Sequence, residues 1–587
     1  MFFSKCYSAV DGPSESLGSK DNLASIDFRW GVKIPMRDDV ELNATVYIPK
    51  EQKPKPAIFT LTPYISDSYH ERAYYFARKG LPFLLVDCRG RGNSGGEFEP
   101  FVNEAEDGHD IVLWLAEQAW CSGEVTMWGG SYAGFNQWMT LKEFPGPLKT
   151  IVPAASAHAA VDFPFYKNIF FPYEMQWQTF TSGNTPNKNL FDEPDFWISK
   201  FQELYLSHRP FKELDKIVGN ESTHFQTWIQ HPTPDTYWAS MALTPEEYER
   251  IDIPILTITG HYDGDQPGAM HFYREHMKFG SPRAKNNHFL VIGPWDHAGT
   301  RTPSKKVGGL EFGDGSMVDL NKLHTEWYEW RMGDGSKPEF LRNRVAYYVL
   351  GAEEWRYVDD LDGVASTRQR LYLDSVGGSA NDVFQSGMLV DEIRVSSEPD
   401  NYVYDPLEVR PAEFLQEEVA NYLTDQRYVL NLFGNGLVYH SAPFDDEVEI
   451  SGNLKLVVWM AIDVPDTDFG AAVYEITLEG RSILLTEDLL RARYRESLLD
   501  EKLVEPGKIN RYVFDGFTFF SKLIGKGSRL QLLLKSPNTI YIQKNYNGGG
   551  VVAEESGEDA RTAHVTVYHD EKYPSYLEAP VNPKEEG

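Results

Sequence analysis

Gly129-Gly130-Ser131-Tyr132-Ala133-Gly134 lies between an apolar run, residues 124–128, and a stretch of helical character, residues 135–143. A serine flanked by glycines at a strand-to-helix turn is typical of a nucleophile elbow, in which the sharp turn exposes the serine hydroxyl above a sheet. The amide of Tyr132 would then be free to donate to an oxyanion. Ala133 stands where the general G-x-S-x-G pattern has its second glycine, so the hexapeptide alone is weak evidence for catalysis.

Two later segments supply the partners that a nucleophilic serine needs, a base to take its proton and an acid to orient the base. Asp263 follows the apolar run 254–259, and His297 follows the next run, 288–292. The order Ser131, Asp263, His297 is that of α/β-hydrolases, and each residue comes after the carboxyl end of a predicted parallel strand, where such sheets build their sites. The three placements together predict a serine hydrolase.

Metal and cofactor sites are the competing interpretations. Asp263, Asp265, Asp296 and His297 could hold a metal, but the serine at the turn would then be unexplained. A calcium loop starting at Asp263 fails, because Pro267 occupies a ligand position and Arg274 stands where the closing glutamate is needed.

The segment 90–95 has the G-x-G-x-x-G outline of a dinucleotide fingerprint. The residues after it, 96–100, open no helix, and they add acidic side chains where a pyrophosphate would lie. A structural turn is the better interpretation, and the sequence therefore predicts neither a metal nor a cofactor.

The hydrophobic pattern predicts an α/β-hydrolase core with an inserted helical lid and a C-terminal β jelly roll. Alternating segments at 28–34 and 40–48 indicate antiparallel strands, and the compact apolar runs that follow indicate a parallel sheet covered by helices. Those runs are residues 57–61, 81–86, 125–128, 150–155, 254–259 and 288–292. Beyond about residue 344, short strands separated by Gly, Asn, Asp and Pro indicate a sandwich or jelly roll. The predicted units are a polar tail (1–24), the core (25–155 and 251–344), the lid (156–250) and the jelly roll (345–587).

Composition limits the partners. The formal charge of −31 disfavours nucleic acid, whose binding depends on Lys and Arg, and no apolar run is long enough to span a bilayer. No secretory signal is readable, and three scattered cysteines (Cys6, Cys88 and Cys121) form no disulfide framework, so we expect a cytoplasmic protein. A homo-oligomer stays open, because no interface stripe can be read.

Several motifs together resemble the cocaine esterase family, which also includes X-Pro dipeptidyl-peptidases, α-amino-acid ester hydrolases and glutaryl-cephalosporin acylases. The motifs are Thr62-Pro63-Tyr64, residues 87–96, 120–123 and 129–134, Tyr262-Asp263-Gly264, Gly293-Pro294-Trp295-Asp296-His297, and the C-terminal stretches 441–443, 450–452, 466–469 and 491–495. The glycine at 134 is itself part of the family pattern. The resemblance implies Ser131 as nucleophile, His297 as base and acid, Asp263 as orienting carboxylate, and an oxyanion hole made by the Tyr64 hydroxyl and the Tyr132 amide.

The acyl pocket is less well determined. Cocaine-cleaving family members have an aromatic residue two positions beyond the triad acid, whereas this chain has Asp265. The α-amino-acid ester hydrolases have acidic residues at that position and at the next one. This chain matches the first with Asp265 but has Gln266 in place of the second acidic residue. We expect Asp265 to bias the acyl pocket toward an amine or another donor-bearing group, or else to be a structural loop carboxylate. Gln266 is a further candidate, as are two aromatic residues of the lid, Trp177 and Phe165.

The alternatives to a small-molecule esterase are of two kinds. An X-Pro dipeptidyl-peptidase or a β-lactam side-chain acylase would share the triad but cleave an amide. A carbohydrate-binding protein on an inactive hydrolase scaffold would leave the intact triad unexplained.

Overall fold

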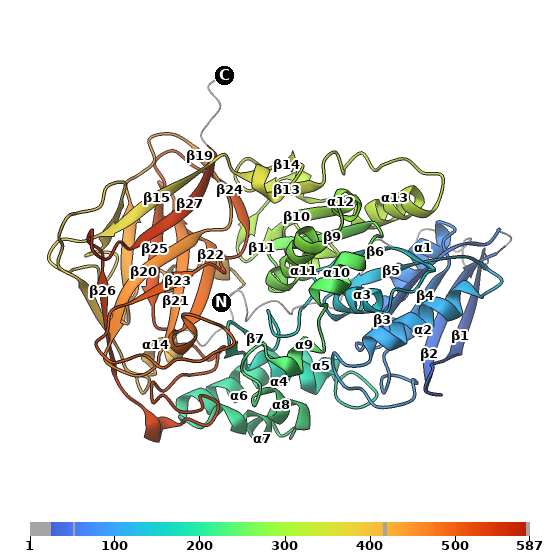
Figure 1. The fold of residues 1–587 in the computed structure, drawn as a ribbon, viewed down its shortest axis with the longest axis horizontal. Helices are drawn as coiled ribbons and strands as arrows, with labels where there is room; N and C mark the ends of the chain where they lie inside the picture. Colours follow the sequence, from blue (N-terminus) through green and yellow to red (C-terminus); the bar gives the residue numbers. More distant parts are fainter. Residues whose placement is uncertain (1–24, 51–52, 415–419, 583–587) are drawn as a thin grey trace.

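The chain builds two sheet-based domains with a helical segment beneath them (Figure 1). The structure, a computed structural model, describes residues 25–50, 53–414 and 420–582. The predicted tail, residues 1–24, lies outside the described residues. No helix in these ranges is both long and apolar enough to cross a bilayer.

The first domain is a mixed sheet of ten strands in the order β1-β2-β4-β3-β5-β6-β9-β10-β13-β14. The strands are β1 (Ile26–Pro35), β2 (Glu41–Pro49), β3 (Lys55–Thr62), β4 (Phe83–Asp87), β5 (Cys121–Gly130), β6 (Leu148–Ala154), β9 (Ile255–Tyr262), β10 (His288–Asp296), β13 (Val345–Val349) and β14 (Glu354–Val358). The strands from β4 to β13 in this order pair in parallel, and β1, β2 and β14 add antiparallel edges. The six predicted apolar runs thus form adjacent parallel strands.

Helices cover both faces of this sheet, which explains why its central strands are apolar on both sides. One core contains side chains of α2, α3 and α11, and the core on the opposite face contains side chains of α1 and α13. Their bounds are α1 (His70–Arg78), α2 (Glu104–Ala116), α3 (Tyr132–Lys142), α11 (Gln266–Phe279) and α13 (Leu320–Met332), with the short α12 (Pro282–Asn286) between α11 and β10.

The segment between β6 and β9 is mainly helical. It includes a hairpin of two two-residue strands and continues through helices that lie mostly below the first sheet (Figure 1), whereas the last of them packs beside α11. The elements are β7 (Phe165–Tyr166), β8 (Ile169–Phe170), α4 (Tyr173–Phe180), α5 (Lys188–Phe191), α6 (Pro194–Leu206), α7 (Leu214–Val218), α8 (Thr223–Trp228), α9 (Thr236–Ala239) and α10 (Pro245–Arg250). Its aromatic side chains share one apolar core with α2, α3 and α11, so the segment packs directly on the first domain.

The C-terminal domain is a sheet of thirteen strands that closes over a single core. The strands are β15 (Thr367–Asp374), β16 (Gly387–Val390), β17 (Asp400–Tyr404), β18 (Gly436–Ser441), β19 (Val448–Gly452), β20 (Lys455–Ile462), β21 (Asp468–Ile476), β22 (Ser482–Arg491), β23 (Asn510–Phe514), β24 (Phe520–Ile524), β25 (Arg529–Lys535), β26 (Ala563–Tyr568) and β27 (Tyr576–Asn582), and the short helix α14 (Arg410–Phe414) lies between β17 and β18. On β25, Leu530, Leu532 and Leu534 face this core, whereas Leu533 packs toward Tyr262 and Tyr348 of the first domain.

One predicted boundary differs from the sheet topology. The sequence predicts that residues 345–350 open the C-terminal domain, but β13 pairs in parallel with β10, and β14 extends the same sheet. The pattern of a short strand does not reveal which sheet it joins, because burial on both faces is decided by its neighbours. The chain leaves the first sheet only after β14.

Candidate active site

Ser131 occupies a strained turn between β5 and α3. Its φ is +61° and its ψ is −128°, a conformation that costs a non-glycine residue roughly 1–3 kcal/mol and is concentrated at functional sites. The Ser131 amide donates to the carbonyls of Ala154 (3.0 Å) and Ala155 (2.9 Å), which fixes the turn against β6. A Cβ at Gly134 would lie 2.7 Å from the Ala154 oxygen, so the shifted glycine is required by close approach of α3 to the same strand.

His297 and Asp263 form a buried pair beyond the ends of β10 and β9. Asp263 Oδ1 lies 2.8 Å from His297 Nδ1, so this ring nitrogen carries the proton and donates to the carboxylate. Asp263 also accepts from the Thr259 hydroxyl (2.9 Å) and the Asp265 amide (3.1 Å). Three donors therefore fix the carboxylate in the orientation that an imidazole base needs.

Sheet order brings the predicted residues to one edge. Tyr64, Ser131, Asp263 and His297 follow β3, β5, β9 and β10, and all four strands run in parallel, so their carboxyl ends meet at the same side of the sheet. The side chains of Ser131, Asp263 and His297 are buried, as expected for chemistry that is shielded from bulk water.

Tyr64 has the properties of a hydrogen-bond donor that stays neutral. Burial raises the pKa of its phenol to about 12, against opposing hydrogen bonds from Trp177 and Ser131, and the charge of Asp265 adds to the rise. The indole Nε1 of Trp177 donates to the Tyr64 hydroxyl over 3.0 Å. The hydroxyl thus lies between Ser131 and Trp177, where its own proton can be donated to an oxyanion formed at Ser131.

Asp265 lies beside the His297–Asp263 pair. Its Oδ2 is 3.7 Å from His297 Nδ1, and only 2% of the residue is exposed. The side chain does not cap α11, although the residue occupies the N-cap position. A buried carboxyl group therefore lies next to the proposed base.

Gln266 and Phe165 are not positioned to bind a substrate. Gln266 Nε2 donates to the carbonyls of Gly260 and Phe519 (both 2.9 Å), and Oε1 accepts from the Phe519 amide (2.6 Å), so the whole side-chain amide is committed to protein groups. Phe165 has no exposed surface, and its ring packs edge-on against Phe170 and Trp238. The sequence identified both as polar or aromatic neighbours of the site but could not reveal these contacts.

Two further arginines were not predicted as part of the site. Arg301 lies against the backbone of Gly130, since a Cβ there would be 2.4 Å from its Nη1. Arg91, in the turn 90–95, contacts the segment that carries Tyr64 and the helix that carries Trp177. For Arg91, the signal in the sequence was its position between two glycines after a buried strand.

The candidate metal ligands have other partners. Asp296 Oδ1 accepts from the amide of Gly299, which caps the turn after His297, and Asp263 is committed as described. Within the described ranges, no group of three or more His, Cys, Asp or Glu side chains has the arrangement of a metal site.

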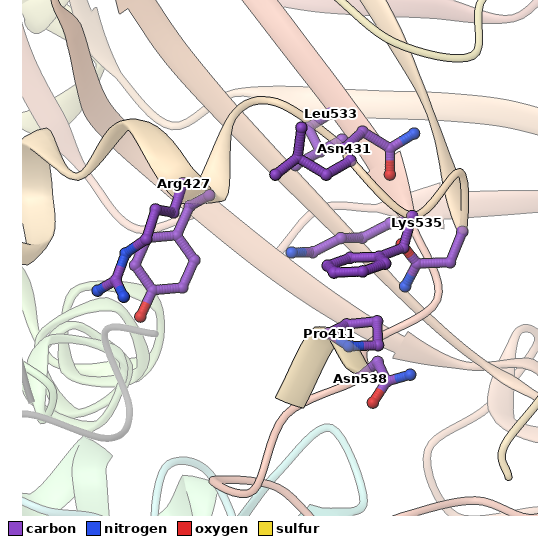
Figure 2. A pocket seen from close by; sticks show the side chains of 10 residues that line it. Pro411, Arg427, Asn431, Leu533, Lys535 and Asn538 are labelled. Carbon is purple, nitrogen blue, oxygen red and sulfur yellow. The ribbon is translucent and has the colours of Figure 1, made fainter. Parts of the chain in front are cut away.

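A separate pocket lies in the C-terminal domain. Figure 2 shows six labelled residues of its lining, with the Lys535 side chain directed into the space between Arg427 and Pro411. Most polar groups around it have protein partners: Asn538, for example, accepts from the Tyr205 hydroxyl and donates to the Glu408 carbonyl. None of the predicted site residues lines this pocket.

Comparisons with known proteins agree with this architecture. Residues 38–299 match the model of the X-Pro dipeptidyl-peptidase (S15) family, and residues 340–578 match its C-terminal non-catalytic domain. Cocaine esterase from Rhodococcus sp. (strain MB1 Bresler) is 27% identical over 575 residues, which cover 94% of this chain and 98% of that protein.

Two solved structures share the fold over nearly the whole chain. An aminopeptidase from a marine sediment Thaumarchaeota archaeon superimposes with a TM-score of 0.82 at 22% identity, covering 98% of this chain and 99% of that one. An α-amino acid ester hydrolase gives a TM-score of 0.81 at 22% identity, covering 97% and 98%. Their arrangement, an N-terminal mixed sheet and a C-terminal sheet-rich domain, is also the arrangement of this chain.

Proposed function

The chain belongs to the serine hydrolase family of cocaine esterase and the X-Pro dipeptidyl-peptidases, and we propose that it cleaves carboxylic esters through an acyl-enzyme formed on Ser131. The observation that carries the proposal is the His297–Asp263 hydrogen bond of 2.8 Å at the sheet edge where Ser131 is held in a strained turn. The substrate is a small-molecule ester.

Each proposed step uses a group of this chain. Ser131 Oγ attacks the ester carbonyl while His297 Nε2 takes its proton, and Asp263 stabilises the imidazolium that forms. The tetrahedral oxyanion accepts from the Tyr64 hydroxyl and the Tyr132 amide. His297 then returns the proton to the leaving alkoxide, and the alcohol departs. Water, activated by the same imidazole, attacks the acyl-enzyme and releases the acid and the free serine.

The proposal gives the domains around the site the roles that we expect from the sequence. In this proposal the helical segment 156–250 is a lid, the C-terminal domain is a jelly roll, and together they wall the acyl pocket above the core of residues 25–155 and 251–344, to which β13 and β14 are now added. Trp177 of the lid supports this view, because it contacts the Tyr64 hydroxyl. The low cysteine content remains consistent with a cytoplasmic location.

Asp265 would favour esters whose acyl part carries an ammonium group. Its buried carboxylate near His297 would pair with an ammonium group on the acyl part, as in an α-amino-acid ester. An X-Pro dipeptidyl-peptidase or a β-lactam side-chain acylase would use the same triad but cleave an amide. We favour the ester, because the cocaine esterase relative matches over nearly the full length of both chains.

The test is hydrolysis of phenyl acetate by the wild-type chain and by Ser131→Ala. The proposal expects activity in the first and a loss of at least about 10³-fold in kcat in the second. A Ser131→Ala protein that retains wild-type turnover would overturn it.

A further inference from the structure

We propose that Arg91 and Trp177 are positioning residues that together fix the Tyr64 hydroxyl in the oxyanion hole. The inference rests on the proposed function, since Tyr64 must be an oxyanion donor for its position to affect turnover. It gives a role to the glycine-flanked arginine of the segment 90–95, which the proposed reaction does not otherwise use.

Helix α4 holds the Tyr64 side chain at two points. Trp177 Nε1 donates to the hydroxyl (3.0 Å), and the ring of Phe180, one helical turn later, stacks on the phenol with centroids 5.6 Å apart. The ring is therefore held on its face and the oxygen at its end. Trp177 itself is anchored by stacking on Tyr132, with centroids 5.7 Å apart, so one indole contacts both proposed oxyanion residues.

Arg91 joins the backbone next to Tyr64 to the end of the same helix. Its Nε donates to the carbonyl of Pro63 (2.8 Å), and its Nη1 donates to the carbonyls of Thr181 (2.6 Å) and Gly183. The residue has no exposed surface. One rigid guanidinium thus sets the distance between the loop that carries Tyr64 and the C-terminus of α4.

Burying the charged side chain of Arg91 costs free energy, and packing alone does not require a charge at this position. In the part of the chain that the structure describes, its guanidinium forms no salt bridge, and burial lowers its pKa to about 10. The charge is stabilised instead by backbone carbonyls at a helix C-terminus, where the helix dipole is negative. The ring of Phe98 (5.9 Å) and the charge of Asp87 add to this stabilisation, but the guanidinium has no carboxylate in direct contact. A buried cation in such surroundings is expensive unless its geometry is needed.

The turn around Arg91 is itself fixed by the protein backbone. The amide of Gly90 donates to the Gly95 carbonyl (2.8 Å), and the amide of Gly92 donates to the Asn184 carbonyl just beyond α4 (2.7 Å). These bonds occupy amides that a phosphate would otherwise use. The segment 90–95 therefore holds Arg91 in a fixed position between the sheet and the lid.

The position of the Tyr64 oxygen and its acceptor bond matter because a phenolic proton can point to either of two sides of the C–O bond in the ring plane. When the oxygen accepts from the Trp177 N–H, the Tyr64 proton is directed away from the indole and toward Ser131. Accepting one hydrogen bond also strengthens the one that the hydroxyl donates. Losing this orientation weakens the interaction with the oxyanion, which forms only in the transition state, so kcat should fall while KM changes little.

A double-mutant cycle tests the coupling, with phenyl acetate as the probe because its small acyl group limits contact with the indole. Trp177→Phe keeps an aromatic ring against Tyr132 and removes the N–H. We expect it to lower kcat about tenfold with KM within about twofold. In the Tyr64→Phe background, where no hydroxyl remains to be positioned, the same change should alter kcat less than about twofold.

Arg91→Lys is the second variant, since a lysine cannot bridge the Pro63 and Thr181 carbonyls as a planar guanidinium does. It should show the same pattern, a loss of kcat with Tyr64 present and little loss in the Tyr64→Phe background. If Arg91→Lys fails to fold, the Trp177→Phe cycle still decides whether α4 positions the Tyr64 hydroxyl, and an additive cycle would overturn the inference for both residues. Equal losses in both backgrounds would overturn the inference, because Trp177 would then act by packing or by contact with the acyl group.

The proposed function can fail separately. If Ser131→Ala keeps wild-type turnover, the reaction itself is wrong. If Ser131→Ala is inactive but the cycle is additive, only the positioning role is wrong.

Discussion

The side-chain amide of Gln266 pairs with the backbone of Phe519 in both directions: Nε2 donates to the carbonyl (2.9 Å) and Oε1 accepts from the amide (2.6 Å). Gln266 begins α11, three residues after Asp263, and Phe519 directly precedes β24 of the C-terminal domain. The loop that carries the proposed triad acid is therefore held to the C-terminal domain by hydrogen bonds.

Gln266→Leu should destabilise the chain and reduce its turnover together. The change removes the side-chain partner of the Phe519 amide and carbonyl and one of two donors to the Gly260 carbonyl. An unsatisfied buried group costs about 1–3 kcal/mol, so we expect a loss of at least about 2 kcal/mol in the free energy of unfolding. Denaturant unfolding measures it. Gln118→Leu is the matched control, because the side chain of Gln118, just beyond α2, donates one hydrogen bond, to the Trp114 carbonyl. Equal losses in the two variants would contradict a special role for Gln266.

Asp263→Asn should be far more damaging to turnover than Asp265→Asn. An amide at 263 carries no negative charge to stabilise the His297 imidazolium, and its NH2 group can replace an acceptor of the present bonds with a donor, so the imidazole loses its orienting acid. Loss of the orienting acid costs a triad about 10³–10⁴-fold in kcat. The measurement is kcat for phenyl acetate. If the ranking were reversed, Asp265 would be the orienting acid.

Asp265→Asn should instead change the preference between two esters. Phenylglycine methyl ester carries an ammonium that its deaminated analogue, phenylacetic acid methyl ester, lacks. We expect a selective rise in KM for the amine-bearing ester, because the buried carboxylate is its counter-charge. Equal effects on both esters would leave Asp265 with a structural role only.

Glu104 should make stability depend on pH. Its carboxyl accepts from the Tyr132 hydroxyl (2.5 Å), its other oxygen has no partner among the described residues, and burial raises its pKa to about 8. The native state therefore keeps a proton that the unfolded chain loses near pH 4.5, so this stabilisation is complete below about pH 4.5 and is lost as the pH rises to about 8.

Glu104→Gln removes this titration. Compared with this variant, the wild type should lose about 1.4 kcal/mol of unfolding free energy per pH unit between about pH 5 and 8. Other buried acids titrate in both proteins and cancel in the difference. Parallel curves for the two proteins would show that Glu104 is ionised in the native state.

Asp468→Asn should destabilise the C-terminal domain. Arg491 donates to both oxygens of Asp468 (2.8 and 2.9 Å) and to the carbonyl of Asn168 in the turn between β7 and β8, and the pair is almost fully buried. Removing one charge of a buried pair costs roughly 3–5 kcal/mol. Glu505→Gln, which breaks the exposed pair with Lys508, is the control and should cost less than about 1 kcal/mol. A similar small loss in both variants would contradict the account.

The sequence predicted what depends on local patterns. The apolar runs indicated the parallel strands, and the small residues around Ser131 indicated the strained turn, because close backbone approach excludes side chains there. It could not predict that β13 joins the first sheet, that Gln266 fastens two domains, or that Arg91 bridges to the end of α4, far along the chain. These contacts depend on side-chain partners distant in sequence, and neither periodicity nor spacing encodes them.

The most direct test of the central claim is covalent labelling with a fluorophosphonate, followed by intact-mass and peptide mass spectrometry. A serine activated by His297 should form one adduct per chain, located at Ser131, and phenyl acetate hydrolysis should fall in proportion to labelling. Ser131→Ala should form none. A wild-type chain that hydrolyses the ester but stays unlabelled, or carries its inactivating adduct at another residue, would contradict the account.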